Sequence, residues 1–240
     1  MLATALPSSA PFARPSLEGA ATGSFDTNAF ARRLIAGEVR TYDAKSHLYY
    51  EGDAATHVYR IASGNVSVYR MMPDGRRQIV DLAYPGDVIG LGAPRTHGAN
   101  AQAISTTRVS CVPVAVLHDM VRRDPTLGLA LCGALSRDLQ AAQDRLLAVG
   151  RCSASERLAG FLLGLSRRNA RNGEDPGVIV LPITRSDIAD CLGLTTETVS
   201  RTFTAFRGDG LIDLEQGVLV TILDMKALTE LAQGERRAVN

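Results

Sequence analysis

The sequence predicts an α+β protein built from three consecutive parts: an antiparallel β-roll, a long helix that pairs with a second copy, and a winged helix-turn-helix. Three observations predict this order. Short alternating strands punctuated by glycine run from about residue 39 to residue 104, a heptad seam follows between residues 125 and 150, and two capped helices joined at a glycine occupy residues 184–203. The 240 residues suffice for two compact domains.

Residues 1–28 are expected to form a disordered arm. They are rich in Ala, Pro, Ser and Thr, and Pro7, Pro11 and Pro15 interrupt every apolar run that a secretory signal would need. No stretch of the chain approaches the ~20 apolar residues of a membrane span. The four cysteines form no CxxC pair, which favours reduced thiols. The sequence therefore indicates a cytoplasmic protein without membrane contact.

The charge balance limits how the chain can bind nucleic acid. The 26 Lys and Arg residues nearly cancel the 25 Asp and Glu residues, which leaves a formal charge of +1. A uniformly basic coat is thereby excluded, because the long-range field of the whole protein is close to zero. Any DNA binding must come from a local surface and a defined motif.

Residues 29–123 are predicted to form the β-roll. The run His57–Ile61 alternates as a half-buried strand does. Four glycines recur at intervals of 12, 11 and 11 residues, close to the spacing of successive hairpins; they are Gly52, Gly64, Gly75 and Gly86. Asp74-Gly75 predicts a tight primed turn, because glycine supplies the positive φ that such a turn requires.

Residues 124–150 are predicted to form a dimerisation helix. Its seam advances in alternating steps of four and three residues through Gly128, Cys132, Leu135, Leu139, Ala142, Leu146 and Val149. A second apolar stripe contains Leu127, Leu131 and Ala134. A helix with two apolar faces covers two surfaces, so one stripe packs on the roll and the seam pairs with a second copy to give a homodimer. The alternative is a helix buried within one chain.

Residues 151–240 are predicted to form a winged helix-turn-helix. Ser153 and Glu156 have the spacing of a capping box that starts a first helix. Within the motif itself, Thr184 and Asp187 suit the start of one helix, Gly193 the turn, and Thr195 the N-cap of the next. Two short apolar runs, one on each side of residues 215–217, then form a hairpin. This hairpin is the wing.

The second helix of this motif is predicted to read DNA bases. Glu197, Ser200 and Arg201 share one face, and their side chains suit cytosine, thymine and guanine respectively. The remaining candidate DNA contacts are short hydroxyl residues and one arginine at the start of the first helix; they are Thr195, Thr196, Thr198 and Arg185. The alternative is an ordinary surface helix with an exposed Glu-Arg pair worth about 0.3 to 0.5 kcal/mol.

Order, spacing and motif together resemble the CRP/FNR superfamily of bacterial transcription regulators over roughly residues 30–230. The resemblance rests on the roll with its turn at residues 86–90, the long helix, and residues 197–201, which are similar to the E-x-x-S-R signature of the FNR side. It implies a jelly roll like that of cyclic-nucleotide-binding domains and a homodimeric activator that works with RNA polymerase. Because Thr196 stands where cAMP-type members carry Arg, it also implies a TTGAT-N4-ATCAA-like palindrome. Glu197 and Arg201 would read its G·C pair, and Ser200 a neighbouring thymine.

The roll departs from two ligand sets of this superfamily, so no cofactor is expected. Where cyclic-nucleotide members have a Gly-Glu turn and an Arg-Ser pair, this chain has Gly86-Asp87 and His97-Gly98. Residues 1–110 contain no cysteine for an iron-sulfur cluster, and Ser110 occupies the family's roll position beside Cys111. This combination is similar to the FixK branch, whose members act in low-oxygen and nitrogen-metabolism control. The alternative is an effector-gated regulator that binds haem or a nucleotide in the roll.

Cys191 and Cys152 are candidates for redox regulation, and the alternative for each is a small structural residue. The four histidines have no partner at ligand spacing, so no metal site is predicted. No set of nucleophile, base and orienting group is evident, and the chain is expected not to be an enzyme. A thiol enzyme remains an alternative that only the four cysteines support.

Overall fold

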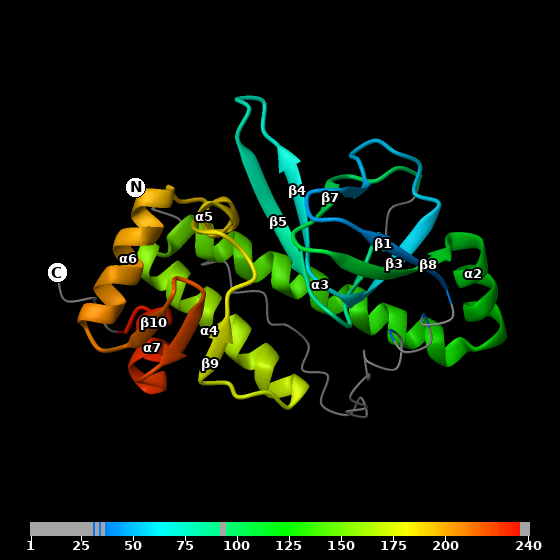
Figure 1. The fold of residues 1–240 in the computed structure, drawn as a ribbon. Helices are drawn as coiled ribbons and strands as arrows, with labels where there is room; N and C mark the ends of the chain where they lie inside the picture. Colours follow the sequence, from blue (N-terminus) through cyan, green and yellow to red (C-terminus); the bar gives the residue numbers. More distant parts are fainter. Residues whose placement is uncertain (1–30, 32–33, 35–36, 92–94, 236–240) are drawn as a thin grey trace, which may run out of the picture.

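A computed structural model describes residues 31, 34, 37–91 and 95–235. The arm predicted for residues 1–28 lies outside the described residues. Figure 1 shows two lobes, the β-roll and the winged helix-turn-helix, with one long helix running along both. No helix within the described residues is long and apolar enough to cross a membrane.

The first lobe is the antiparallel roll that the sequence predicts. Its strands are β1 (Glu38–Tyr42), β2 (His47–Tyr49), β3 (His57–Ser63), β4 (Val66–Met71), β5 (Arg77–Ala83), β6 (Val88–Ile89), β7 (Asn100–Ala103) and β8 (Thr107–Pro113). They form two four-stranded sheets in the orders β1-β8-β3-β6 and β2-β7-β4-β5. Ile61, Val66, Ala101 and Val109 are fully buried between the sheets. The predicted fold class is confirmed for this lobe.

The hairpin of β4 and β5 has a different turn from the one predicted at Asp74-Gly75. The amide of Gly75 donates to the carbonyl of Met72 at 2.9 Å, and Gly75 alone in this loop has a positive φ, 82°. This hydrogen bond makes Pro73 and Asp74 the central residues of the turn, and the ring of Pro73 fixes φ near −65°, which suits the first central position of an unprimed turn. Asp74 does not have the positive φ that a primed turn at Asp74-Gly75 needs. The prediction of a hairpin is confirmed and the prediction of a primed turn is wrong.

Two helices link the lobes. Helix α2 (Val114–Arg123), which the sequence analysis did not predict, packs on α3 (Pro125–Arg151). Asp124 between them is extended, as a residue before proline tends to be, and Pro125 opens α3, where its missing N–H is tolerated. Along α3, Leu127 and Ala134 are buried, whereas Leu129 is exposed.

The second lobe contains four helices and a small sheet. Its elements are α4 (Ala154–Asn172), β9 (Val178–Val180), α5 (Arg185–Leu192), α6 (Thr196–Gly208), β10 (Ile212–Glu215), β11 (Leu219–Ile222) and α7 (Met225–Ala232). The sheet has the order β10-β11-β9, so the wing hairpin of β10 and β11 pairs with β9, the strand that precedes α5. Leu158, Ile188, Phe206 and Leu228 are fully buried in one shared core. Helix α7, which packs on α4, was not predicted.

Candidate nucleic-acid interface

Helix α5 begins and ends, and helix α6 begins, where the local sequence predicts. Thr184 and Asp187 form a reciprocal capping box at the start of α5. Gly193 ends α5 in the left-handed conformation with φ 63°, which glycine adopts without a Cβ clash. The hydroxyl of Thr195 then accepts a hydrogen bond from the amide of Thr198 at 3.1 Å and caps α6. Three local signals thus fix the geometry of the motif.

The inner faces of the two helices pack together and leave the outer face of α6 free. Ile188 and Ala189 of α5 are buried against Val199 and Phe203 of α6. Ala189 presents only a methyl group, so the two backbones approach closely. Because the apolar side of α6 is committed to this core, the polar residues on its other side face outward.

The predicted base-reading residues lie together on that outer face. The side chains of Glu197 and Arg201 are 78% and 75% exposed, and Oε1 and Nη1 lie 3.6 Å apart. Ser200 stands beside them, with its hydroxyl donating to the carbonyl of Thr196 at 2.9 Å. An exposed pair at this distance is weak, since solvent screens it and both side chains lose freedom. The side chains of Glu197 and Arg201 can therefore separate and each contact a DNA base instead.

The threonines at the start of α6 take two roles. The hydroxyls of Thr195 and Thr198 hydrogen-bond each other at 2.8 Å while Thr195 caps the helix. Thr196 is exposed. The first turn of a helix also has backbone amides with no partner inside the helix, and these suit a phosphate oxygen.

Arg185, the first residue of α5, lies against α6 and the wing. Its guanidinium carbon is 3.4 Å from the centroid of the Phe203 ring, and Nη2 donates to the carbonyl of Gly217 at 3.4 Å. Its Nη1 is buried and has no hydrogen-bond partner among the described residues. Burial lowers the pKa of this guanidinium. Arg185 is thus more enclosed than Arg201.

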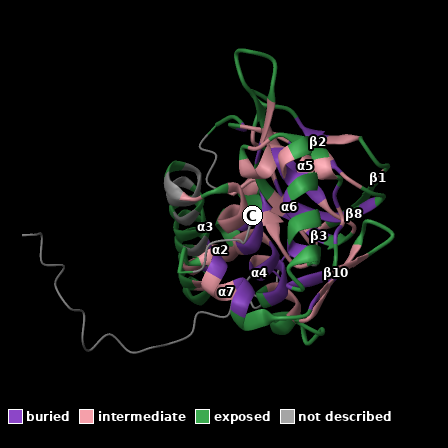
Figure 2. Ribbon diagram, turned by 90° about the vertical axis from the view of Figure 1, so that its left-hand side faces the viewer, coloured by how far each residue is buried: buried purple, intermediate pink, exposed green. Residues whose placement is uncertain are grey.

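The predicted dimerisation seam is exposed along α3. Cys132 and Ala142 are exposed, and Leu135 and Leu139 are 38% and 61% exposed. The side chains of Leu146 and Val149 lie outside the described part of the chain. Figure 2 shows that part of α3 is exposed. The second stripe, with Leu127 and Ala134, lies on a different face and is buried.

Aromatic rings fill part of the roll at the position where cyclic-nucleotide members have an Arg-Ser pair. His97 is 4% exposed and its ring stacks on Tyr49 with 3.6 Å between centroids and an interplanar angle of 12°. Tyr59 lies against both rings. Burial lowers the pKa of His97, so a neutral imidazole is favoured there. A neutral, stacked ring offers no counter-charge to a phosphodiester.

The environment of Cys191 favours its structural interpretation. Burial, together with the nearby carboxylates of Asp187 and Asp190, raises the pKa of its thiol to about 12. A thiol with so high a pKa is almost entirely protonated at neutral pH, and the thiolate is the reactive form. Cys152 is partly buried at the junction of α3 and α4. In the part of the chain that is described, no three His, Cys, Asp or Glu residues are grouped to hold a metal ion.

Sequence analysis missed the residues that join the roll to this motif. The guanidinium of Arg77 on β5 hydrogen-bonds the carboxylates of both Asp187 and Asp190 on α5. Burial alone would raise the pKa of Asp187, but hydrogen bonds from Thr184 and Arg77 hold it below its usual value. Arg77 and Asp190 are 113 positions apart, and no local pattern connects residues at such a separation.

Two protein-family models together match most of the chain. Residues 39–124 match the cyclic nucleotide-binding domain, and residues 156–231 match the Crp-like helix-turn-helix domain. The two matches fall on the two lobes described above, and together they leave the seam of α3 between them.

Individual proteins resemble the chain over most of its length. It is 37% identical over 209 residues to the nitrogen fixation regulation protein FixK of Azorhizobium caulinodans, which covers 86% of this chain and 84% of that protein. It is also 37% identical over 210 residues to the transcriptional activatory protein AadR of Rhodopseudomonas palustris, covering 88% and 86% of the two chains. The structure of FixK2 from Bradyrhizobium japonicum superposes with a TM-score of 0.78 at 32% identity, over 85% of this chain and all of that one.

Proposed function

The chain belongs to the CRP/FNR family of transcription regulators, and from this premise we propose that it is a FixK-like activator that binds a TTGAT-N4-ATCAA-like palindrome as a homodimer. Its signal class would be nitrogen metabolism, as the name of the FixK relative suggests, or low oxygen, as the resemblance to the FixK branch implies. It would act on RNA polymerase in the cytoplasm. AadR, whose name describes an activator, supports the activating role.

The observation that carries this proposal is the outer face of α6. Glu197, Ser200 and Arg201 are exposed together there, and no other element among the described residues covers them. Arg201 has the donor geometry for guanine O6 and N7, Glu197 accepts from cytosine N4, and Ser200 is small enough to lie against a thymine methyl group. One G·C pair and a neighbouring thymine in each half-site match this set.

The remaining contacts would hold the second lobe, residues 154–232, on the DNA backbone. We call this lobe the reader. Thr195, Thr196, Thr198 and the free amides of the first turn of α6 suit phosphate oxygens. Arg185 would add positive charge beside the wing, where its guanidinium lies on the Phe203 ring and donates to the carbonyl of Gly217. Such contacts set position and affinity without reading sequence.

Dimerisation would place two such readers on one face of the DNA. The exposed seam of α3, with Leu135 and Leu139 at its centre, is the surface we assign to the second copy. In a two-fold dimer the same residues meet their own equivalents, and the recognition helices then reach half-sites about 34 Å apart. Doubling the few positive groups of one reader compensates for the near-zero net charge of the chain.

We favour this regulator over one gated by haem or a nucleotide in the roll. The stacked, buried rings of Tyr49 and His97 occupy the region of the missing phosphate-binding pair, and His97 is disfavoured as a cation. The enclosed, protonated thiol of Cys191 likewise supports a structural role over a redox switch. Control by the amount of protein in the cell remains as the simplest mode.

The test is binding to the palindrome and to a version with the G·C pair of each half-site replaced. Arg201→Ala is expected to weaken binding to the intact palindrome by about 1 to 3 kcal/mol and to remove the preference between the two DNAs, because the bidentate contact is lost. Fluorescence anisotropy at fixed salt concentration measures both affinities.

Arg207→Ala is the matched control, since Arg207 is an exposed arginine near the other end of α6, 3.5 Å from Asp213. It should retain the preference. Equal weakening of Arg201→Ala on both DNAs would assign Arg201 to phosphate. Wild-type protein that binds the palindrome no better than random DNA would refute the proposed function.

A further inference from the structure

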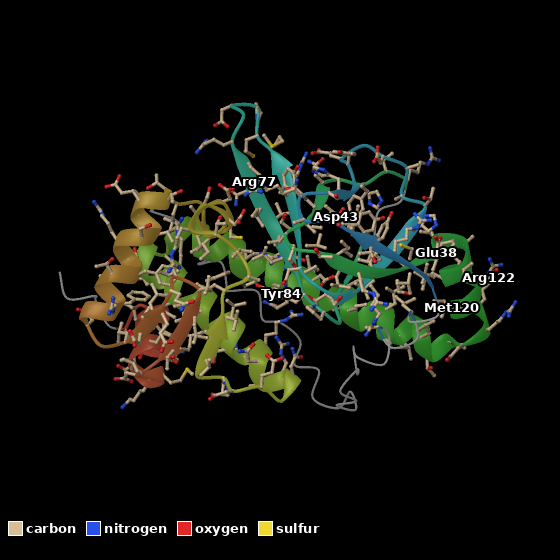
Figure 3. All side chains as sticks on the ribbon, viewed as in Figure 1. Glu38, Asp43, Arg77, Tyr84, Met120 and Arg122 are labelled. Atoms are coloured by element: carbon tan, nitrogen blue, oxygen red, sulfur yellow. The ribbon has the colours of Figure 1, made fainter. Side chains whose placement is uncertain are left out.

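Strand β5 of the roll holds helix α5 of the DNA reader through one arginine. Nε and Nη2 of Arg77 lie 2.9 and 2.8 Å from one carboxylate oxygen of Asp190, and Nη2 also donates to Asp187. The next residue, Gln78, donates from its side-chain amide to the backbone carbonyl of Asp190. Figure 3 shows Arg77 on β5, on the side that faces α5.

A second contact joins the lobes at the other end of β5. Arg168 of α4 donates to the carboxylate of Asp87 at 2.8 Å, and its guanidinium carbon lies 4.2 Å from the centroid of the Tyr84 ring. Leu82, Tyr84 and Ile104 of the roll pack against the apolar core of the reader. The roll therefore touches the reader at two separated points, with an apolar contact as well.

The Arg77 contact is stronger than an ordinary surface ion pair. The side chains of Arg77, Asp187 and Asp190 are only 28%, 16% and 25% exposed. One guanidinium serves two carboxylates that are nearly one helical turn apart on the same face of α5. Without it, two like charges would remain close together and poorly solvated, which is unfavourable.

The covalent link between the lobes does not fix their relative orientation. Only Cys152 and Ser153 separate the end of α3 from the start of α4. Two residues contribute several rotatable backbone bonds, so a reader attached to α3 at that point alone would swivel. The contacts from β5 are the further points of attachment that a fixed orientation requires.

Orientation of α5 determines orientation of α6. The two helices share the buried core of Ile188, Ala189 and Val199 and are separated by three residues, 193–195. Asp187 also belongs to the capping box of α5. Arg77 therefore contacts α5 at its N-terminal end, where the capping box already holds the backbone. A rotation of α5 about this contact would carry α6 with it.

We propose that Arg77 is a positioning residue for DNA recognition: from the roll, and through Asp187 and Asp190, it fixes the angle of the reader on α3 and thereby the spacing of the two recognition helices in the dimer. The proposal rests on the proposed function. It gives the roll a mechanical role in reading DNA that requires no ligand. It predicts selectivity for the length of the spacer between the half-sites.

The test compares Arg77→Gln with wild-type protein on palindromes that have three, four or five central base pairs. Wild-type protein is expected to bind the four-base-pair spacer best. Arg77→Gln should bind that spacer about tenfold more weakly, while its affinity for the other two spacers changes little. The difference in affinity between the four-base-pair spacer and the other two is then smaller than in wild-type protein. Arg76→Gln is the matched control, because Arg76 is exposed and its one ion pair among the described residues is with Asp74 in the same hairpin turn.

The double variant Arg77→Gln with Asp190→Asn sharpens the assignment. Asp190 is not part of the capping box, so its replacement leaves the start of α5 intact. The losses of the two single changes should overlap in the double variant, since both remove the same contact. Hydrogen exchange without DNA should also be faster in β5 and α5 of Arg77→Gln.

Three results would overturn this role. An equal loss on all three spacers would reduce Arg77 to a general contribution to stability. A salt dependence of binding lowered by about one counterion would make Arg77 a phosphate contact. Unchanged affinities on all three DNAs would refute positioning while leaving the proposed function intact, whereas failure of wild-type protein to bind any palindrome would refute both.

Discussion

Two arginine-carboxylate contacts in this molecule differ in nearly every physical respect. On α6, Arg201 and Glu197 are about three-quarters exposed and 3.6 Å apart. At the junction of roll and reader, Arg77 is enclosed between Asp187 and Asp190 and lies 2.8 Å from the latter. The first pair consists of neighbours on one helix, and the second joins two lobes.

The difference teaches where each kind of charge is useful. An exposed pair on one helix is worth a few tenths of a kcal/mol, so DNA bases can replace it almost without penalty. A half-buried contact with two carboxylates loses much more when it is broken, because the remaining charges stay poorly solvated. The weak pair suits recognition and the strong contact suits alignment.

Removal of Asp187 should have the largest effect on stability. Asp187→Ala removes the carboxylate that accepts a hydrogen bond from the backbone amide of Thr184 in the capping box. It also removes one of the two carboxylate partners of Arg77. We expect the free energy of unfolding to fall by about 2 kcal/mol or more. Urea denaturation followed by circular dichroism measures this free energy. A loss below about 0.5 kcal/mol would mean that the Arg77 contact stabilises the protein no more than the exposed pair on α6 does.

The contribution of Asp187 should also depend on pH. Its pKa is lowered in the folded protein, so the unfolded chain takes up the proton first as the pH falls. Its stabilisation is therefore present above the ordinary aspartate pKa of about 3.9 and is lost as the pH falls from there through the lower folded value.

Asp187→Asn provides the comparison, because it does not titrate. The difference in unfolding free energy between wild-type protein and this variant should be largest near pH 7 and should shrink as the pH is lowered to about 3. A difference that stays constant over that range would contradict a lowered pKa at Asp187.

Removal of Glu197 should have the smallest effect on stability. Glu197→Ala breaks the exposed pair with Arg201, and we expect the free energy of unfolding to change by no more than about 0.5 kcal/mol. The same variant should nevertheless lose base preference in the anisotropy assay. A large destabilisation would mean that the pair on α6 has a structural role after all.

The sequence determined the features that depend on residues close together in the chain. The capping boxes at Ser153 and Thr184, the left-handed Gly193 and the cap at Thr195 all use hydrogen bonds or dihedral angles within about four residues. The glycine-marked roll, the winged motif and the outer face of α6 follow from such local rules. Local residue patterns were therefore enough to predict them.

The tertiary structure alone decided which distant surfaces meet. The heptad spacing indicated two apolar stripes on α3, but the partners of Leu127, among them Val58 of β3 and Leu117 of α2, are seen only in the folded chain. The stacking of His97 on Tyr49 and the grip of Arg77 on α5 join residues far apart in sequence. Such contacts depend on how completed elements dock, which is a property of shape and charge over whole surfaces, and local periodicity carries no record of it.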